Sequence, residues 1–316
     1  MEGAIKTNGQ IKTRSNLSKI IAYLSENGSL YLMLIPAVIL LAIFHYYPMY
    51  GVIIAFQKFN PGLGFDRSPW VGLDNFKYLF AIPDISQIFI NTLTIAILKI
   101  ITLQVCSLGL AIALNEVRNV IFKRAIQTTI YLPHFLSWVV LSGILIDMLG
   151  SRGLMSNVLR VFGIEPIMFL GSNETFVPLL IVTNLWKEVG WSTIIFLAAL
   201  TGIDPTLHEA AAIDGASRWQ RIMNVNIPGI APTIILLTCL SLGGILNAGF
   251  EQILNLYSPV VYQTGDILDT YVYRAGLISA RYSLAGAIGL IKSVMGFFLV
   301  VIAYWLADKY SGYRIY

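Results

Sequence analysis

The sequence predicts an all-α integral membrane protein with six transmembrane helices, and three observations support this fold class. Of its 316 residues, 56% are hydrophobic and 12% are charged, whereas charged residues make up about 25% of an average soluble domain. Apolar runs long enough to cross a bilayer, about 20 residues, recur along the chain. The runs lack the alternation of barrel strands, and unpaired backbone amides are too costly in lipid, so the runs are expected to be helices.

The expected transmembrane helices follow the apolar runs 30–56, 88–114, 125–149, 176–200, 229–250 and 284–307. Residues 1–29 are expected to form an N-terminal tail, and residues 30–316 the transmembrane domain. The first run is too long and too far from the start for a cleaved signal peptide, so we expect it to be retained. Cys106 and Cys239 fall inside runs, where cysteine behaves as a small apolar residue, so they predict no disulfide framework.

Basic residues at the ends of the runs predict the orientation. Those expected on the cytoplasmic side are Lys6, Lys12, Arg14, Lys19, Arg118, Lys123, Arg124, Arg218, Arg221, Lys309 and Arg314. The other loops carry fewer basic residues over longer segments, as the positive-inside rule requires. The sequence thus predicts a multi-pass protein of the cell (inner or plasma) membrane with both termini cytoplasmic. These residues explain the net charge of +4, which gives no reason to expect nucleic acid as a partner.

The sequence contains none of the common catalytic motifs. No glycine-rich loop ends in Gly-Lys-Ser or Gly-Lys-Thr, so the chain lacks the phosphate cradle that an ATPase uses. His208-Glu209 is followed by alanines, which breaks the zinc-protease pattern, and His45 and His134 lie on other segments. No Gly-x-Ser-x-Gly elbow occurs. We therefore expect no catalytic residue, no metal site and no enzyme activity of the chain itself.

Residues 201–228 form a polar segment between the fourth and fifth runs. Asp204 before Pro205 suits a helix N-cap followed by proline at the first helical position. Gly215 can take the left-handed conformation that ends a helix, so we expect a short helix over 206–214.

A second short helix is expected directly after this one. Ser217 and Gln220 have the spacing of a capping box, and the helix is expected to end as Pro228 approaches. On these local signals alone, the segment could simply lie at the membrane interface, with Trp219 at headgroup depth.

The same segment carries a recognisable motif. Glu209-Ala210-Ala211 is followed after three residues by Gly215, and after nine more by Val225-Asn226-Ile227-Pro228. This pattern resembles the EAA signature of the binding-protein-dependent (type I) ABC importer permeases. The usual ending of the signature is Ile-x-Leu-Pro, and Val225 and Ile227 depart from it conservatively in size and apolarity.

The resemblance extends over nearly the whole chain. Short matches to sugar-importer permeases are Leu34-Ile35-Pro36-Ala37, Phe44, Tyr47-Pro48, Asn91-Thr92, Leu132-Pro133, Gly153, Asn157, Leu159, Trp186 and residues 196–200. A narrower likeness, to the permeases of oligosaccharide and polysaccharide (alginate-type) importers, is carried by residues 250–257, Asp266, Asp269-Thr270-Tyr271 and Arg274.

The resemblance implies a fold, a function and a set of partners. The fold would be that of type I ABC importer permeases, with a cytoplasmic coupling helix in the loop 201–228. The function would be ATP-driven uptake of an oligosaccharide or polysaccharide fragment from an extracytoplasmic solute-binding protein by alternating access. Other partners would be a second permease in a heterodimer, two cytoplasmic ATPase subunits that hold ATP and magnesium, and the lipid bilayer; this chain would bind no cofactor. The ATPase contact would be made by Glu209, Ala210, Ala211, Asp214 and Gly215.

Ionisable residues at membrane depth are costly and are therefore functional candidates; here they are Lys99, Asp147, Lys187, Glu188 and Lys292. Lys99 and Lys292 could instead pair with neighbouring helices or extend toward the interface, and Asp147 is close enough to the outer end to contact water.

The substrate path is expected near the centre of the fourth run. Aromatic rings there can stack on sugar faces, and polar groups can hydrogen-bond to sugar hydroxyls; the set is Asn184, Trp186, Lys187, Glu188 and Trp191. An ion pair between helices or subunits explains Lys187 and Glu188 equally well. Aromatic residues in the outer segments 58–87 and 251–283 fit an interfacial belt, and the second segment could instead contact the binding protein.

An alternative function from another class is that of an ion-gradient-driven secondary transporter or channel. Its charge relay would consist of Lys187, Glu188, Asp147 and Lys292. Such transporters contain inverted repeats with matching Gly or Pro breaks, and the sequence shows no convincing repeat. Transport that needs an added ATPase subunit favours the importer, whereas transport driven by an ion gradient alone favours the alternative.

Overall fold

The computed structural model describes residues 27–165 and 167–311. Most of the predicted tail 1–29 lies outside these ranges, as do the basic residues Lys6, Lys12, Arg14, Lys19 and Arg314. Within the described ranges, the regular structure is helical, apart from one isolated bridge between Gln57 and Trp70. The all-α fold class is therefore confirmed. The chain divides into two compact units, Met1–Ile53 and Ile54–Tyr316.

The first unit holds a long helix over the first apolar run. It begins as α2 (Gly28–Leu41), continues through η1 (Ala42–Tyr46) and α3 (Tyr47–Met49), and passes into η2 (Tyr50–Phe56). The wide, π-type turn of η1 directly precedes Pro48. A proline inside a helix removes one backbone donor, and its ring collides with the carbonyl four residues earlier. The wide turn makes room for the ring, so the helix continues beyond it.

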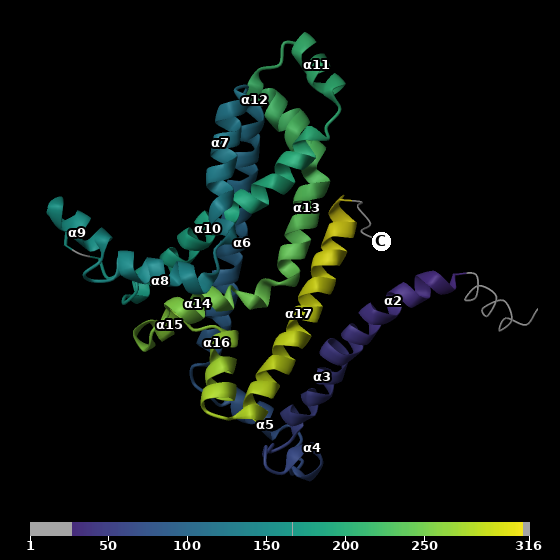
Figure 1. Ribbon diagram of the computed structural model, residues 1–316, viewed down its shortest axis with the longest axis vertical. Helices are drawn as coiled ribbons and strands as arrows, with labels where there is room; N and C mark the ends of the chain where they lie inside the picture. Colours follow the sequence, from purple (N-terminus) through teal and green to yellow (C-terminus); the bar gives the residue numbers. More distant parts are fainter. Residues whose placement is uncertain (1–26, 166, 312–316) are drawn as a thin grey trace, which may run out of the picture. The chain divides into compact units, whose positions relative to one another are not determined.

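The second unit contains the other helices (Figure 1). Its first half consists of α4 (Gly64–Arg67), α5 (Asp74–Phe80), α6 (Ile85–Glu116), α7 (Val120–Tyr131), η3 (Leu132–Phe135), α8 (Trp138–Leu149), α9 (Leu154–Val161) and α10 (Asn173–Thr201). Its second half consists of α11 (Pro205–Ile213), α12 (Arg218–Arg221), η4 (Ile222–Asn226), α13 (Ile227–Gly243), η5 (Ile245–Asn247), α14 (Phe250–Leu256), η6 (Pro259–Val261), α15 (Tyr262–Gly265), α16 (Leu268–Tyr273), η7 (Arg274–Ile278) and α17 (Tyr282–Ser311).

Five stretches of the described chain are long and apolar enough to span a membrane. A sixth is formed by α10 and α11 together, although the two helices are bent by 69° relative to each other. The other five are Gly28–Phe56, Ile85–Glu116, Trp138–Val161, Arg218–Gly243 and Tyr282–Trp305. This number agrees with the six transmembrane helices expected from the sequence.

The third predicted run, 125–149, is not one continuous helix, and this corrects the sequence-based expectation. The chain is broken between α7 and α8, where Pro133 cannot continue the α-helical hydrogen bonds. Ser137 has extended backbone and caps α8, because its hydroxyl accepts a hydrogen bond from the Val140 N–H at 3.3 Å. His134 lies in this break, and its side chain contacts Glu188 of α10.

The fifth predicted run, 229–250, is shifted toward the N-terminus in the structure. Its helix begins at Arg218 and ends at Gly243, seven residues before the predicted end (250 − 243). The backbone then turns through left-handed conformations at Ala248 (φ 45°) and Gly249 (φ 85°) before α14 begins. Glycine adopts this conformation at little cost, so the chain changes direction there and enters α14.

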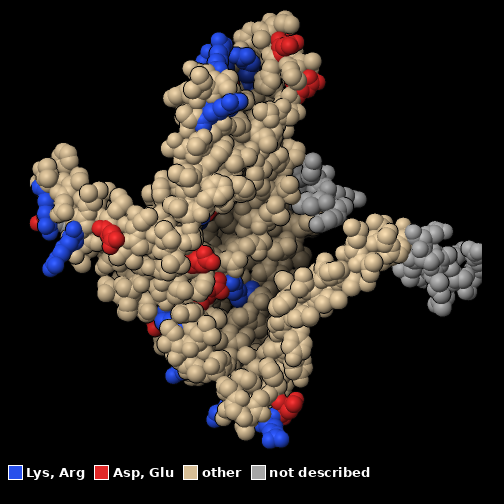
Figure 2. Space-filling view, in the orientation of Figure 1, with Lys and Arg blue, Asp and Glu red and all other residues tan. Residues whose placement is uncertain are grey.

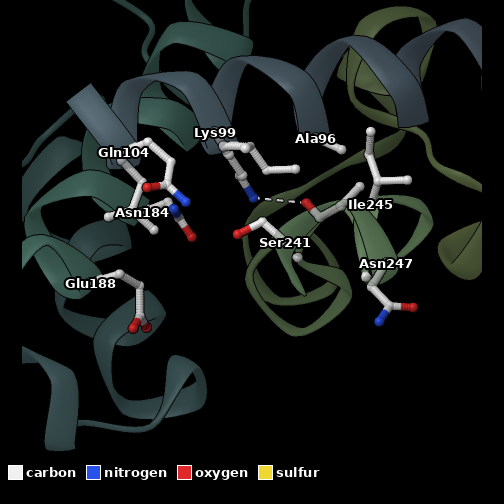
Figure 3. Close-up of a pocket in the computed structure, with 13 residues that line it drawn as sticks. Ala96, Lys99, Gln104, Asn184, Glu188, Ser241, Ile245 and Asn247 are labelled. Atoms are coloured by element: carbon white, nitrogen blue, oxygen red, sulfur yellow. Dashed lines mark hydrogen bonds between the residues drawn. The ribbon is translucent and has the colours of Figure 1, made fainter. Parts of the chain in front are cut away.

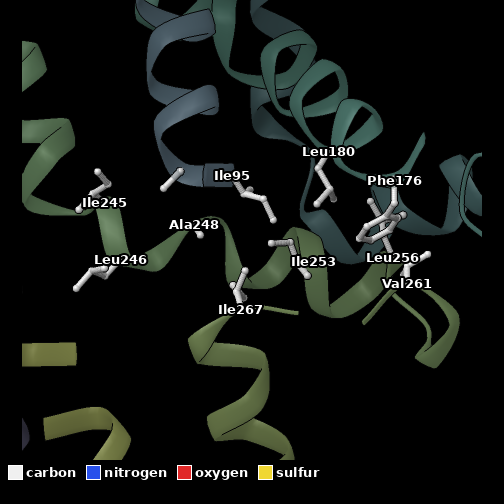
Figure 4. Close-up of a cluster of buried hydrophobic side chains, with 11 residues drawn as sticks. Ile95, Phe176, Leu180, Ile245, Leu246, Ala248, Ile253, Leu256, Val261 and Ile267 are labelled. Atoms are coloured by element: carbon white, nitrogen blue, oxygen red, sulfur yellow. The ribbon is translucent and has the colours of Figure 1, made fainter. Parts of the chain in front are cut away.

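The core of the second unit is the contact between α6 and α10. At one end of the pair, α14 adds to a buried apolar cluster, which Figure 4 shows: Ile95, Ala96, Phe176, Leu180, Ile245, Leu246, Ala248, Ile253, Leu256, Val261 and Ile267. At the other end, Ile230 of α13 packs against Leu114 of α6 and Phe196 of α10 in a second cluster. Inside a bilayer, close van der Waals packing rather than release of water holds such helices together.

Candidate functional site

The segment between α10 and α13 has the local structure expected from the sequence. Asp204 caps α11, because its carboxylate accepts a hydrogen bond from the Thr206 N–H at 2.9 Å, and Pro205 occupies the first turn. These hydrogen bonds hold the pKa of Asp204 below its usual value. Gly215 follows the helix with φ +73°, a conformation in which a side chain would be strained.

The second short helix begins as predicted but does not end at Pro228. Ser217 and Gln220 form a complete capping box, with bonds of 3.3 and 2.7 Å. From Arg218 the helix then continues without a break into α13. The π-type turn of η4 precedes Pro228 as η1 precedes Pro48, and it accommodates the proline ring in the same way.

Helix α11 is exposed along its whole length. None of its residues is buried, and the apolar side chains of Leu207 and Ile213 are 53% and 86% exposed. Of the five predicted coupling residues, only Ala211 is half-buried, and the exposed ones are Glu209, Ala210, Asp214 and Gly215. In Figure 2, acidic and basic side chains gather at this end of the unit, over α11 and the neighbouring helices, whereas the helices below are largely uncharged. An exposed apolar surface flanked by charges is typical of a protein contact site.

A polar pocket lies between α6, α10 and the end of α13 (Figure 3). Its volume is about 200 Å³, and its polar lining consists of Lys99, Gln104, Asn184, Glu188, Ser241 and Asn247. Lys99 Nζ donates hydrogen bonds to the Ala248 carbonyl at 2.8 Å and to Gln252 Oε1 at 2.5 Å. The pocket thus presents hydrogen-bonding groups at membrane depth but no nucleophile paired with a base.

Lys187 and Glu188 form a charged cluster with the break between α7 and α8. Lys187 Nζ lies 2.9 Å from Glu188 Oε1 and donates to the His134 carbonyl at 2.9 Å. The other carboxylate oxygen, Glu188 Oε2, lies 2.8 Å from His134 Nδ1. The ring of Trp191 stacks on His134, with centroids 4.6 Å apart, and Lys187 also lies over Trp138. Lys187 and Glu188 thus pair with each other within α10, whereas the ion pair considered from the sequence lay between helices or subunits; the contacts that leave α10 are made with His134.

The structure separates the five predicted substrate-path residues into three environments. Asn184 and Glu188 line the polar pocket. Lys187 is buried and pairs with Glu188. Trp191 stacks on His134, and it and Trp186 are both about half exposed, at 46% and 49%. Sequence reasoning missed Gln104, Ser241 and Asn247 as lining residues. Spacing offered one usable signal, since Lys99 and Gln104 lie on one face of α6 with Ala96, Ile100 and Leu103.

The remaining ionisable residues at membrane depth also have defined surroundings. Lys292 on α17 contacts both oxygens of Asp269 at 2.6 and 2.7 Å and donates to Asn247 at 2.9 Å. Asp147 is exposed near the end of α8. In the described part of the chain, no group of three or more His, Cys, Asp or Glu residues has a geometry suited to a metal ion.

The segment between α13 and α17 contains an organised cluster around Arg274. Its guanidinium makes two hydrogen bonds to the carboxylate of buried Asp266, at 2.8 and 2.5 Å, and lies 4.2 Å from the ring centroid of Tyr262. Burial by itself would lower the pKa of Arg274. The hydrogen bonds to Asp266 and Tyr257 have the larger effect, so the pKa of Arg274 is raised above its usual value. Burial raises the pKa of the Tyr257 and Tyr271 hydroxyls. Such a network fixes the fold of this segment.

Two known proteins are similar to this chain over nearly its whole length. Protein LplB of Bacillus subtilis (strain 168) is 42% identical over 292 residues, which cover 92% of each chain. The polygalacturonan/rhamnogalacturonan transport system permease protein YteP of the same organism is 41% identical over 301 residues, covering 94% of this chain and 93% of YteP.

Two solved structures of a bacterial ABC transporter also contain a chain similar to this one. A chain in the crystal structure of a bacterial ABC transporter involved in the import of the acidic polysaccharide alginate is 38% identical, with a TM-score of 0.87, covering 92% of this chain and 99% of that chain. A chain of the bacterial alginate ABC transporter in complex with an alginate pentasaccharide-bound periplasmic protein is 37% identical, with a TM-score of 0.85, covering 91% and 96%.

Residues 105–312 match the family model of the binding-protein-dependent transport system inner membrane component. The match covers most of the second unit, including the exposed helix α11 and the pocket residues from Asn184 onward, whereas Lys99 and Gln104 lie before its start. The chain therefore belongs to the family of inner membrane components of binding-protein-dependent transport systems.

Proposed function

We propose that the chain is a permease subunit of an ATP-driven ABC importer for an oligosaccharide or polysaccharide fragment. The cargo would arrive on an extracytoplasmic solute-binding protein and cross the membrane by alternating access. Family membership carries the transport function, and the names of the relatives support a carbohydrate cargo. The alternative of a transporter driven by an ion gradient receives no support from this family.

The exposed helix α11 is the observation on which the coupling role depends. It lies between α10 and the continuous helix that contains α13, so a force on α11 reaches two membrane-spanning helices directly. Its surface combines exposed apolar side chains at Leu207 and Ile213 with the small residues Ala210 and Ala211, which allow close approach of a partner. We infer that this surface contacts a cytoplasmic ATPase subunit.

ATP hydrolysis would then take place on partner subunits, since this sequence has no phosphate-binding loop. The assembly would contain a second permease and two ATPase subunits that hold ATP and magnesium. Closure of the ATPase pair would change the tilt of the permease helices and open the polar pocket alternately to the two sides of the membrane.

The polar pocket is the part of this chain best suited to contact the cargo. Asn184, Gln104 and Asn247 offer amide groups that can hydrogen-bond to sugar hydroxyls. Glu188 lines the pocket while its charge is balanced by Lys187, so it can accept hydrogen bonds without leaving a buried charge unpaired. Trp186 does not line the pocket, but it is 49% exposed and could stack on a sugar face beside it.

Reconstitution tests the proposal. The chain, its partner permease, the ATPase subunits and the binding protein are incorporated into or added to proteoliposomes, and uptake of a labelled oligogalacturonide is measured. We expect uptake only when ATP and every component are present. A matched assembly with a catalytically inactive ATPase should take up nothing.

Two results would overturn the proposal. One is uptake by this chain with a sodium or proton gradient and no ATPase. The other is ATP-dependent uptake that continues when α11 is replaced by a flexible linker of equal length, because coupling would then not require this helix.

A further inference from the structure

Lys99 is a buried cation whose charge is not balanced by any carboxylate in the described part of the chain. The residue is 7% exposed near the middle of α6. Its two hydrogen-bond partners, the Ala248 carbonyl and Gln252 Oε1, are neutral. Gln252 in turn donates to the Leu180 carbonyl and to Thr183 Oγ1, at 2.8 Å each, so its amide orientation is fixed.

The other lysines at membrane depth differ from Lys99. Lys187 pairs with Glu188 at 2.9 Å, and Lys292 pairs with Asp269 at 2.6 Å. An ammonium ion in a poorly solvated interior is unfavourable unless an opposite charge is close to it. Lys99 therefore lacks the counter-charge that the protein supplies to both other lysines.

The ammonium group lies at the polar pocket. Lysine has three donors, and two of those of Lys99 are used within the protein. Gly249 has φ +85°, and a Cβ at this position would overlap Lys99 Nζ, so glycine leaves the space that the ammonium occupies. In Figure 3, Lys99 lies on one side of the pocket and Glu188 on another, with its carboxylate turned away from Lys99.

A second group in the pocket also lacks a partner. Gln104 Oε1 is buried and makes no hydrogen bond in the structure. Asn184 and Ser241 line the same pocket. A ligand that carries both an anionic group and hydroxyl donors would balance the charge of Lys99 and satisfy Gln104, whereas a neutral sugar could hydrogen-bond to both residues but would leave the charge of Lys99 unbalanced.

We propose that Lys99 recognises a carboxylate of the cargo, so that the pocket selects acidic saccharides, such as uronate oligomers, over neutral ones. This inference rests on the proposed function. The two bonds to Ala248 and Gln252 position the ammonium, and the cargo carboxylate supplies the missing charge. Lys99 is then a specificity-determining residue of the translocation path.

A purely structural role would predict a different pattern. Lys99 also contacts the turn between α13 and α14, through the Ala248 carbonyl. If that were its whole role, substitution would affect acidic and neutral cargo alike. The test therefore compares two ligands that differ only at their carboxyl groups, which are charged in one and are neutral methyl esters in the other.

The experiment measures equilibrium binding of trigalacturonate and of its fully methyl-esterified form to the assembled transporter in nanodiscs, without the binding protein. We expect the unaltered transporter to bind the acid at least ten-fold more tightly than the ester. Lys99→Gln should weaken binding of the acid until the two affinities are within about two-fold, and Lys99→Arg should keep part of the preference. Lys58→Gln, which removes one exposed positive charge outside the pocket, is the matched control and should keep the full preference.

Equal weakening of both ligands by Lys99→Gln would overturn the proposal, and so would an unaltered transporter that binds the two ligands equally or binds neither. If the Lys99→Gln protein does not assemble, the two ligands can still be compared on the unaltered transporter. Lys99→Arg is then the variant whose preference is measured. If Lys99 proves not to select acidic cargo, ATP-dependent uptake in proteoliposomes is unaffected. If the proposed function is wrong, the uptake experiment shows it, because uptake then does not require ATP.

Discussion

Gly190 lies where α10 crosses α7, and the crossing leaves no room for a side chain. A Cβ at this position would overlap the Ile130 carbonyl, which belongs to the backbone and cannot rotate away. The same part of α10 contains Lys187 and Glu188, which contact His134 beyond the end of α7. The close approach of α10 and α7 therefore brings Lys187 and Glu188 within hydrogen-bonding distance of His134.

We predict that Gly190→Ala destabilises the protein by about 1–3 kcal/mol, because the added methyl group forces the two helices apart. Thermal unfolding of the purified chain in detergent measures the effect. Gly109→Ala is the matched control, since nothing lies within 4 Å of a Cβ added to that glycine of α6. An equal loss of stability in both variants would show that the crossing is not tightly packed.

Sequence reasoning identified single residues best where their partners are near in the chain. Asp204 caps α11 as expected, through the Thr206 N–H two residues later. Lys187 and Glu188 pair with each other within α10 and not between helices or subunits. Lys99 contacts a carbonyl 149 residues away, and no local pattern encodes that contact. His134 was not expected to join the cluster, because its approach to α10 depends on the break at η3.

At the scale of elements, α11 is a short helix that depends on its ends. Asp204 provides the N-cap, and Gly215 provides the left-handed residue that terminates the helix. The Thr206 N–H holds the pKa of Asp204 below its unfolded value of about 3.9. The stabilisation by the ionised cap is therefore complete above that value and is lost as the pH falls through the lower folded pKa.

We predict that Asp204→Ala lowers coupling several-fold, because the first turn of α11 loses its cap, whereas Asp204→Asn keeps coupling close to that of the unaltered protein. The measured quantity is the number of saccharides transported per ATP hydrolysed by the assembled transporter. The amount of assembled complex serves as the control for folding. Similar coupling in the alanine variant and the unaltered protein would rule out a role for the cap.

Both ends of α11 and the start of α12 could be predicted, because capping is a property of a few neighbouring residues. The two corrections to the transmembrane helices have a different origin. Pro133 lies at a break, whereas Pro228 and Pro48 lie inside continuous helices. A proline by itself does not distinguish these outcomes, since a π-type turn before it restores the helix.

At the scale of the whole molecule, the distribution of basic residues predicts that α11 and the segment 251–283 lie on opposite sides of the membrane. We predict that a cysteine at Ile213 reacts with a membrane-impermeant thiol reagent only from the cytoplasmic side, and a cysteine at Val260 only from the outside. Both positions are well exposed, at 86% and 65%. Labelling is compared in intact cells and in inverted vesicles.

The two native cysteines, Cys106 and Cys239, are first replaced by alanine and serine, and this cysteine-free protein is the control for background labelling. Reaction of the Ile213→Cys variant in intact cells would reverse the orientation. It would also place α11 out of reach of a cytoplasmic ATPase, and the coupling role would have to be abandoned.

The uninterrupted helix from Arg218 to Gly243 has a geometric consequence. It contains 26 residues, so at about 1.5 Å per residue its two ends are about 39 Å apart, and a swing of about 10° about one end displaces the other by about 7 Å. Ser241 and Gly244, which line the pocket, lie at the far end. A small angular change at the Arg218 end thus becomes, at the other end, a displacement longer than two hydrogen bonds, wide enough to separate these residues from α6. If Pro228 had kinked the helix, a swing of its first turn would have been absorbed by bending at the kink, and the far end would have moved less.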